Sequence, residues 1–255
     1  MMKSSLVFFG KEVREIFRTY KIYALPLVLL AFGFASPILT KILPDILEGM
    51  AGDVAIQLPE MTWRDSYEQL FKNLSQIGML VLIITTMGTV ADEKSRGVAL
   101  LVLTKPLSRT GYLLSKYAAT ALLLTVSTVV AFGAAWYYTT ILFEGTQLMP
   151  GLAATGLFIL YALLVAAVTL LCSVISRSLV AAGGLAVLGY FILSIMPVTH
   201  HQMAVYSPAA LLSYQQKLLT GAEVMPQLGW AIAICVMAIA AVLAVSAVIF
   251  SRQEL

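Results

Sequence analysis

Charged side chains are scarce in this chain of 255 residues. Aspartate, glutamate, lysine and arginine together make up 11% of the sequence, whereas apolar residues make up 60%. A soluble domain carries about 25% charged and about 45–50% apolar residues. The scarcity of charge therefore excludes a soluble fold and predicts an integral membrane protein.

Features of several other protein classes are missing as well. The two cysteines, Cys172 and Cys235, both lie in apolar runs, so the sequence predicts no disulfide framework. The formal net charge of +3 comes from scattered bases rather than from a basic stripe, so we expect no nucleic-acid partner. The H-E-x-x-H pattern is absent, and we predict neither a catalytic nor a metal site.

Long apolar stretches dominate what is present. Six of them are long enough to cross a hydrocarbon core, which takes about 17–25 helical residues. They lie near residues 22–39, 73–91, 117–138, 152–175, 179–198 and 228–250. Irregular backbone cannot face lipid, so each span must be helical. The sequence predicts an all-α membrane protein in which residues 1–255 form a single transmembrane domain.

The basic residues predict which ends of the spans face the cytoplasm. With the N-terminus inside and six spans, twelve of the sixteen lysines and arginines are cytoplasmic. Those left outside are Lys41, Arg64, Lys72 and Lys217. Cytoplasmic loops carry an excess of such residues. We therefore expect a multi-pass protein of the cell membrane with both termini in the cytoplasm.

Amphipathic patterns flank the spans. Within residues 1–21, Leu6, Phe9 and Phe17 belong to an apolar stripe opposite a charged face, which predicts a helix lying in the membrane interface. Whether its charged face also borders a cytoplasmic partner is open. We expect a first outer loop over about residues 40–72 that contains a capped helix starting after Thr62, and a short helix over 209–220 that ends at Gly221.

The loop over residues 92–116, between the second and third spans, is the most informative segment. It combines a charged turn, an apolar piece of helical size, a proline stop and a second basic cluster. This combination predicts a small, rigid structure rather than a flexible segment. The phosphate-binding pattern G-x-x-x-x-G-K-[ST] is absent, and the predicted spans contain no ionisable residue in their interior. We therefore expect any energy for transport to come from a separate protein.

This loop carries a family resemblance. Its motifs are Glu93-x-x-x-Gly97, then Thr104-Lys105-Pro106-Leu107-Ser108-Arg109, and Lys116 downstream. They are similar to the E-x-x-x-G and [ST]-x-P-[VL]-S-R patterns of the permease subunits of bacterial ABC exporters of the ABC-2 type, which the chain resembles over essentially its whole length. The resemblance implies a homo- or heterodimer of permease subunits in the lipid bilayer, bound to two copies of a separate ABC ATPase. That ATPase would hold the ATP and Mg, and the present chain would hold no cofactor and would not be an enzyme.

The resemblance also assigns roles within the loop. It implies that the loop is the coupling helix that contacts the ATPase. The residues expected to serve this contact are Glu93, Lys94, Arg96, Gly97, Leu100, Leu103, Pro106, Ser108 and Arg109. We expect Glu93 and Arg96 to make polar contacts with the ATPase and Leu100 and Leu103 to make apolar contacts with it. Pro106 is expected to end the helix.

Hydroxyl residues are the candidates for a transport pathway. The resemblance implies that spans two and five line it, which points to Thr85, Thr86, Thr89 and Ser194. Such residues also serve helix packing or bond to their own preceding turn, and both readings remain open. A polar but neutral lining favours amphipathic or hydrophobic cargo, although the sequence names no substrate.

Two other functions compete with transport. One is a membrane scaffold that recruits a cytoplasmic partner without moving anything. The other is an intramembrane protease, because Asp92-Glu93 resembles a paired-glutamate motif. That motif needs an arginine where this chain has Gly97, and no span supplies the histidine that would complete the site.

Overall fold

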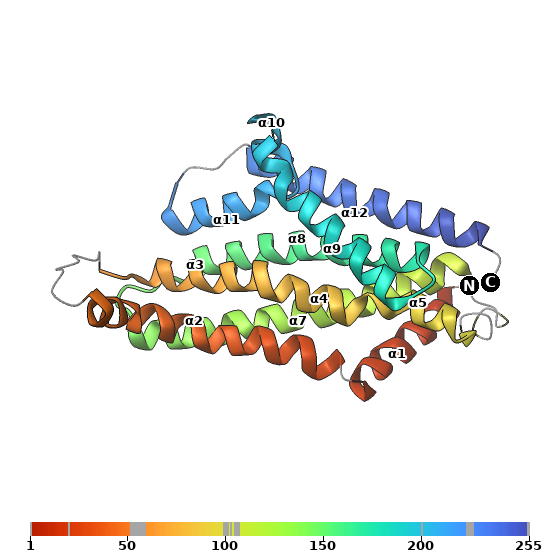
Figure 1. The fold of residues 1–255 in the computed structure, drawn as a ribbon, viewed down its shortest axis with the longest axis horizontal. Helices are drawn as coiled ribbons and strands as arrows, with labels where there is room; N and C mark the ends of the chain where they lie inside the picture. The colour runs from red at the N-terminus through yellow and green to blue at the C-terminus, as the bar shows by residue number, and fades with distance from the viewer. Residues whose placement is uncertain are drawn as a thin grey trace.

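A computed structural model shows an elongated bundle of helices (Figure 1). It describes residues 2–19, 21–51, 60–98, 102, 104, 108–199, 201–222 and 227–253, and these ranges contain no β-strand. Six helical runs are long and apolar enough to span a membrane: Ile22–Gly49, Trp63–Ser95, Arg109–Leu142, Leu148–Ile175, Leu179–Thr199 and Gln227–Arg252. The predicted all-α class and the six predicted spans are confirmed.

The described helices follow one another along the chain in a fixed order. They are α1 (Met2–Arg18), α2 (Lys21–Ala51), α3 (Trp63–Asn73), η1 (Leu74–Gly78), α4 (Met79–Thr86), α5 (Gly88–Ser95), α7 (Arg109–Leu142), α8 (Leu148–Ile175), α9 (Leu179–Thr199), α10 (His201–Tyr206), α11 (Ala210–Thr220) and α12 (Gln227–Arg252). Both termini lie at the same end of the bundle, which we call the N/C end, while α11 and the start of α3 lie toward the opposite end (Figure 1).

Helix α8 forms the centre of the bundle and packs against α7, α9, α11 and α12. Its inward residues include Phe158 and Tyr161, which are fully buried in the main hydrophobic cluster. Helices α2 and α7 approach each other closely, because a Cβ atom added to Gly33 would lie 2.4 Å from the backbone oxygen of Ala131. Small residues allow such close approach between membrane helices.

The first span is longer than the sequence indicated. We predicted a loop from Thr40 onward, and this is wrong, because α2 continues to Ala51. The charges that suggested a loop, Lys41, Asp45 and Glu48, are all exposed and follow one another at helical spacing. They form a polar face on a helix that continues beyond its apolar stretch.

The second span is built from several helical pieces. It starts earlier than residue 73, at the capped helix predicted after Thr62, which is confirmed: Thr62 caps α3, and Asp65 accepts hydrogen bonds from both the backbone nitrogen and the hydroxyl of Thr62 at 2.7 Å. The π-helical turn η1 follows directly, and α4 and α5 complete the run. A π turn inserts an extra residue into an otherwise α-helical register.

The segment before the last span is also mostly helical. The predicted short helix is confirmed as α11, and it ends at Gly221 with φ +77°, a left-handed conformation that glycine adopts without strain. Helix α10 was not predicted, because its six residues are too few for a periodic pattern.

Helix α1 confirms the predicted N-terminal amphipathic helix, and it packs against α7 and α2 at the N/C end (Figure 1). Leu6 and Phe17 of the predicted stripe are exposed, as a lipid-facing stripe requires. The expected orientation of the charged face is wrong in part, because Glu12 is buried together with Phe8 against the protein.

Candidate functional site

The loop predicted to couple to a partner begins at the end of α5, which is tied to the neighbouring helices. The buried hydroxyl of Ser173 on α8 accepts hydrogen bonds from the backbone nitrogens of Val90 and Ala91, both at 3.0 Å. Lys94 donates to the carbonyl of Val174 at 2.6 Å and to the side-chain oxygen of Gln253 at 3.0 Å. This side of the loop is therefore fixed to α8 and to the residues that follow α12.

The other side of the loop is fixed as well. Ser108 caps α7 by accepting a hydrogen bond from the backbone nitrogen of Gly111 at 3.0 Å. The guanidinium of Arg109 donates to the carbonyls of Phe250, Ser251 and Gln253 at 2.8–3.0 Å. These are carbonyls at the end of α12, where a cation also complements the helix dipole. Both sides of the loop thus converge on the C-terminal end of α12.

A buried group of charges joins the two sides. Lys116 on α7 lies 3.0 Å from a carboxylate oxygen of Glu12 on α1 and 2.7 Å from one of Glu93 on α5. The side chain of Lys116 is 2% exposed, and those of Glu12 and Glu93 are 8% and 13% exposed. The hydroxyl of Tyr112 donates to the second oxygen of Glu93. We call these residues, together with Lys11 and Glu15, the Lys116 cluster.

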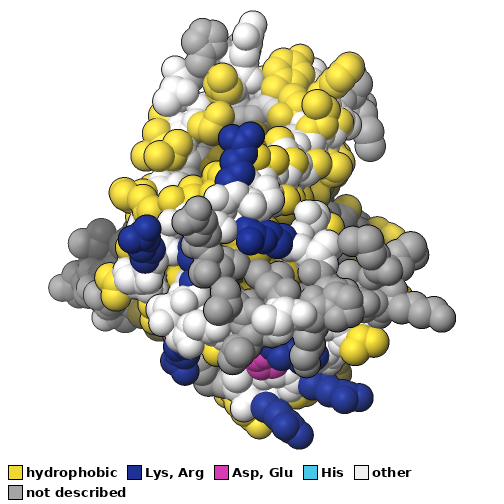
Figure 2. Space-filling view, turned by 90° about the vertical axis from the view of Figure 1, so that its right-hand side faces the viewer, with side chains coloured by type: hydrophobic (Ala, Val, Ile, Leu, Met, Phe, Trp, Pro, Cys, Tyr) yellow, Lys and Arg dark blue, Asp and Glu magenta, His cyan; other side chains and the backbone are white. Residues whose placement is uncertain are grey.

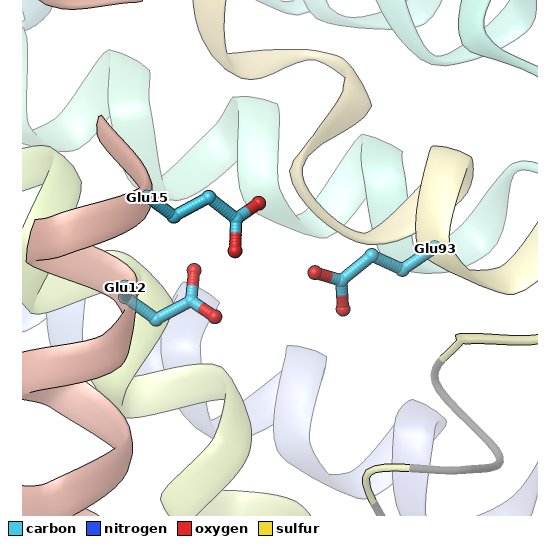
Figure 3. Close-up of side chains that lie close together, drawn as sticks. All are labelled: Glu12, Glu15 and Glu93. Carbon is cyan, nitrogen blue, oxygen red and sulfur yellow. The ribbon is translucent and has the colours of Figure 1, made fainter. Parts of the chain in front are cut away.

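Figure 3 shows the three carboxylates of this cluster pointing toward one another from α1 and α5. Their oxygens lie within 4.8 Å of one another, a spacing that could hold a cation. Two ammonium groups already serve that role, because Lys11 lies 2.5 Å from Glu15 and 3.0 Å from Glu12, while Lys116 bridges Glu12 and Glu93. The geometry is that of a salt-bridge network.

Burial and charge act in opposite directions on Lys11. Partial burial lowers its pKa, but the hydrogen bond to Glu15 and the charge and hydrogen bond of Glu12 together raise the pKa above its ordinary value. The neighbouring carboxylates therefore favour the protonated form of Lys11. Together with Lys116 it offsets the repulsion among the carboxylates.

An aromatic stack covers one side of the cluster. The ring of Tyr112 stacks on Phe250 of α12 at 5.4 Å between centroids and contacts Phe8 of α1 at the same distance. The ammonium of Lys116 lies 5.1 Å from the centre of the Tyr112 ring, within the range of a cation–π contact. The stack excludes water from one side of the ion pairs, so α1, α5, α7 and α12 are joined by both polar and apolar contacts.

The structure separates the predicted coupling residues into two groups. Glu93, Lys94, Ser108 and Arg109 make the internal contacts described above. Arg96 differs, because its side chain is 71% exposed and pairs with Asp92, four residues earlier, at 3.0 Å.

The end of α5 sets the direction of the loop. Gly97 follows α5 with φ +69°, a left-handed conformation that turns the chain away from the helix axis. Leu100, Leu103 and Pro106 lie outside the described residues, so their predicted roles stay predictions.

The hydroxyls of the predicted pathway residues bond to their own helices. Thr85, Thr86 and Thr89 are buried, and each hydroxyl donates to a carbonyl three or four residues earlier at 2.6–3.0 Å. Ser194 donates to the carbonyl of Tyr190 in the same way, at 2.9 Å. This geometry favours the packing alternative, and the lining role stays a prediction.

Sequence reasoning missed the role of Glu12. The residue was assigned to the charged face of an interfacial helix, yet it is four residues from the buried Phe8 and so shares its face of α1. That spacing is the signal that could have placed it toward the protein. Nothing in a single sequence identifies Lys116, 104 residues away, as its partner.

Lysine and arginine side chains are spread over the N/C end, which Figure 2 shows from outside the bundle. Acidic side chains are visible there at one place only, and apolar side chains surround the bases on the flanks. This distribution is the one expected of the end of a membrane protein that faces water beside a membrane surface.

Comparison with known proteins shows the family to which the chain belongs. Residues 55–255 match the family described as "Protein of unknown function (DUF2705)". The chain is also 26% identical over 261 residues to a protein of Bacillus subtilis (strain 168) named "Uncharacterized transmembrane protein YxlG", and the similarity covers 99% of each chain. Together with the six apolar helical runs, these matches show that the chain is a multi-pass membrane protein and belongs to the DUF2705 family.

Proposed function

We propose that this chain is the transmembrane permease subunit of an ATP-driven exporter of the ABC-2 type. In this proposal two permease subunits form the substrate pathway and bind two copies of a separate ATPase. The observation that carries the proposal is the anchoring of the loop over 92–116. Lys94 and Arg109 tie its two sides to the end of α12, and Lys116 ties both sides to α1.

Such anchoring is what a coupling element needs. A partner that moves the loop also moves the ends of α5 and α7, because these helices carry its two sides. The ion pairs of the Lys116 cluster and the bonds to α12 then pass that movement to α1, α8 and α12. A rigid-body change of packed helices is an established route by which a local event reaches a distant site.

The proposal places the N/C end in the cytoplasm of a bacterial cell. The basic surface in Figure 2 supports this orientation, because cytoplasmic segments of membrane proteins are enriched in lysine and arginine. It also brings the loop over 92–116 to the compartment in which an ATPase would find ATP.

The decisive experiment measures ATP turnover. The chain is purified in detergent or nanodiscs together with an ABC ATPase of the same organism, and hydrolysis is compared with that of the ATPase alone. We expect a stable complex and faster turnover. A scaffold would form the complex without changing turnover, and a protease would not require the ATPase at all. A complex with unchanged ATP turnover, or no complex with the ATPase, would contradict the proposal.

Variants of the loop sharpen this experiment. Arg96→Glu and Leu100→Asp change residues expected to contact the ATPase, so both should reduce the stimulation of ATP hydrolysis while the protein still inserts into the membrane. Arg14→Glu makes the same charge change on the exposed part of α1 and serves as the matched control. Equal turnover for Arg96→Glu, Leu100→Asp and Arg14→Glu would contradict a coupling role for the loop.

The pathway is tested separately. Thr85→Trp places a bulky side chain on the second span, and complex recovery and cargo export are then measured independently. Intact assembly with lost export supports a lining role for Thr85, whereas loss of assembly supports packing. Intact assembly with normal export rejects both the lining role and tight packing at this position.

A further inference from the structure

A polar cleft of about 520 Å³ opens at the end of the bundle opposite the termini. It lies between α2, the run α3–η1 and α11. Its polar lining includes Asp65, Glu68, Lys72, Ser75, Gln215 and Gln216, and its apolar lining includes Leu43, Phe71, Leu212 and Leu219. The cleft shares no residue with the Lys116 cluster, and the proposed export function does not use it.

An unpaired hydrogen-bond donor lies in this cleft. Gln215 on α11 is 3% exposed, and its side-chain nitrogen has no hydrogen-bond partner. Buried polar groups in folded proteins nearly always have partners, because an unsatisfied donor loses its bonds to water without replacement. The nitrogen of Gln215 is itself buried, so a ligand in the cleft can supply the missing acceptor once this side chain turns toward the opening.

The rim of the cleft holds two opposite charges that are not joined to each other. Glu68 and Lys72 are four residues apart on α3, the spacing at which such residues commonly pair. Among the described residues no ion pair connects them, and Glu68 instead accepts a hydrogen bond from Gln216 at 3.3 Å. The rim thus offers a carboxylate and an ammonium group to a ligand that carries both charges.

The order of these groups along α3 matches the order within a phospholipid head group. Helix α3 begins at the end of the bundle and runs inward, so Asp65 and Glu68 lie outermost and Lys72 lies about 6 Å deeper along the axis than Glu68. In phosphatidylethanolamine the ammonium is outermost, a two-carbon linker joins it to the phosphate, and the glycerol and acyl chains lie deeper.

An apolar track leads from the cleft along α2. Leu39 and Leu43 are exposed and share one face of the helix, Leu43 also lines the cleft, and Leu39 lies one turn further into the bundle. A small water-soluble zwitterion has no apolar group that could contact these side chains. An acyl chain attached to the bound head group would lie against it.

We propose that the cleft binds one zwitterionic phospholipid of the ethanolamine type. Its ammonium contacts Glu68, its phosphate accepts hydrogen bonds from Lys72 and from the free amide of Gln215, and one acyl chain follows α2. This site belongs to the membrane leaflet at the end of the bundle opposite the termini.

The test uses the full chain, purified in detergent and stripped of lipid. Thermal unfolding is followed while dioleoyl phosphatidylethanolamine, dioleoyl phosphatidylglycerol or free glycerophosphoethanolamine is added. We expect phosphatidylethanolamine to raise the melting temperature most, because a ligand that binds only the folded state stabilises it. Phosphatidylglycerol lacks the ammonium, and the free head group lacks the acyl chains, so both should act only at higher concentration.

Three variants assign the contacts. Glu68→Gln should abolish the preference for phosphatidylethanolamine over phosphatidylglycerol, and Lys72→Gln should weaken binding of both lipids. Gln215→Leu should weaken binding of phosphatidylethanolamine about tenfold, because a hydrogen bond to a charged group is lost. Glu48→Gln and Lys217→Gln make the same charge changes at exposed positions near this end and outside the cleft, and they serve as controls.

Each result bears on the proposal. Equal stabilisation by the two lipids would overturn recognition of the ammonium, and equal action of the free head group would overturn the lipid in favour of a soluble ligand. No stabilisation by any of the three would overturn the site. If Lys72→Gln, an exposed change that leaves the fold intact, binds lipid as the controls do, the cleft is not where the lipid binds.

Discussion

The Lys116 cluster permits a quantitative prediction about stability. Replacing Lys116 with methionine keeps most of the side-chain volume but removes the charge between Glu12 and Glu93, whose side chains are only 8% and 13% exposed. Removing one partner of a buried ion pair costs about 3–5 kcal/mol, because the remaining charges stay buried without compensation. We expect Lys116→Met to lower the free energy of unfolding in detergent by about this amount.

The assay is equilibrium unfolding followed by tryptophan fluorescence. Arg96→Gln is the matched control: it breaks an exposed pair with Asp92 and should cost at most about 0.5 kcal/mol. Adding Glu12→Gln and Glu93→Gln to Lys116→Met should restore much of the loss, since the buried charges then disappear together. If Lys116→Met costs no more than Arg96→Gln, the carboxylates are solvated and the reasoning is refuted.

Three further predictions concern packing and topology. Gly33→Ala places a Cβ atom 2.4 Å from a backbone oxygen of α7 and should lower stability by about 1–3 kcal/mol, whereas Gly49→Ala meets nothing within 4 Å and should not; equal melting temperatures would contradict the close packing. Ser173→Ala removes the hydroxyl that accepts from two backbone N–H groups of α5 and should cost about 1–3 kcal/mol in the same assay, with no change being the contrary result. In a cysteine-free background, Glu48→Cys should react with an impermeant thiol reagent in whole cells and Ser95→Cys should not; labelling of both would reject the proposed orientation.

Local patterns explain which parts of the fold the sequence could predict. The spans follow from long apolar runs, and the caps at Thr62 and Gly221 follow from interactions within a few residues of each helix end. Such features need no knowledge of the partner helix. The end of α2 was mispredicted because its charges were read as a loop, although their spacing is helical.

The candidate site depended on contacts that no local pattern contains. The motif around Glu93 drew attention to the loop over 92–116, and its downstream lysine, Lys116, was part of the same resemblance. The structure adds that the two residues pair with each other and with Glu12. The sequence offers several acids and bases on each of these segments, and only the packing of α1 against α7 selects the ones that meet.

The π-helical turn η1 makes the orientation of α3 sensitive to insertions and deletions in the second span. Deleting one residue between Leu74 and Gly78 would restore ordinary α-helical bonding, but it would rotate α3 by about 100° relative to α4. Tyr67 and Phe71 would then leave their places in the core, and Glu68 and Lys72 would turn away from α11. Insertions and deletions in this turn therefore change the direction in which the cleft faces, whereas substitution of Glu68 or Lys72 changes what the cleft can bind.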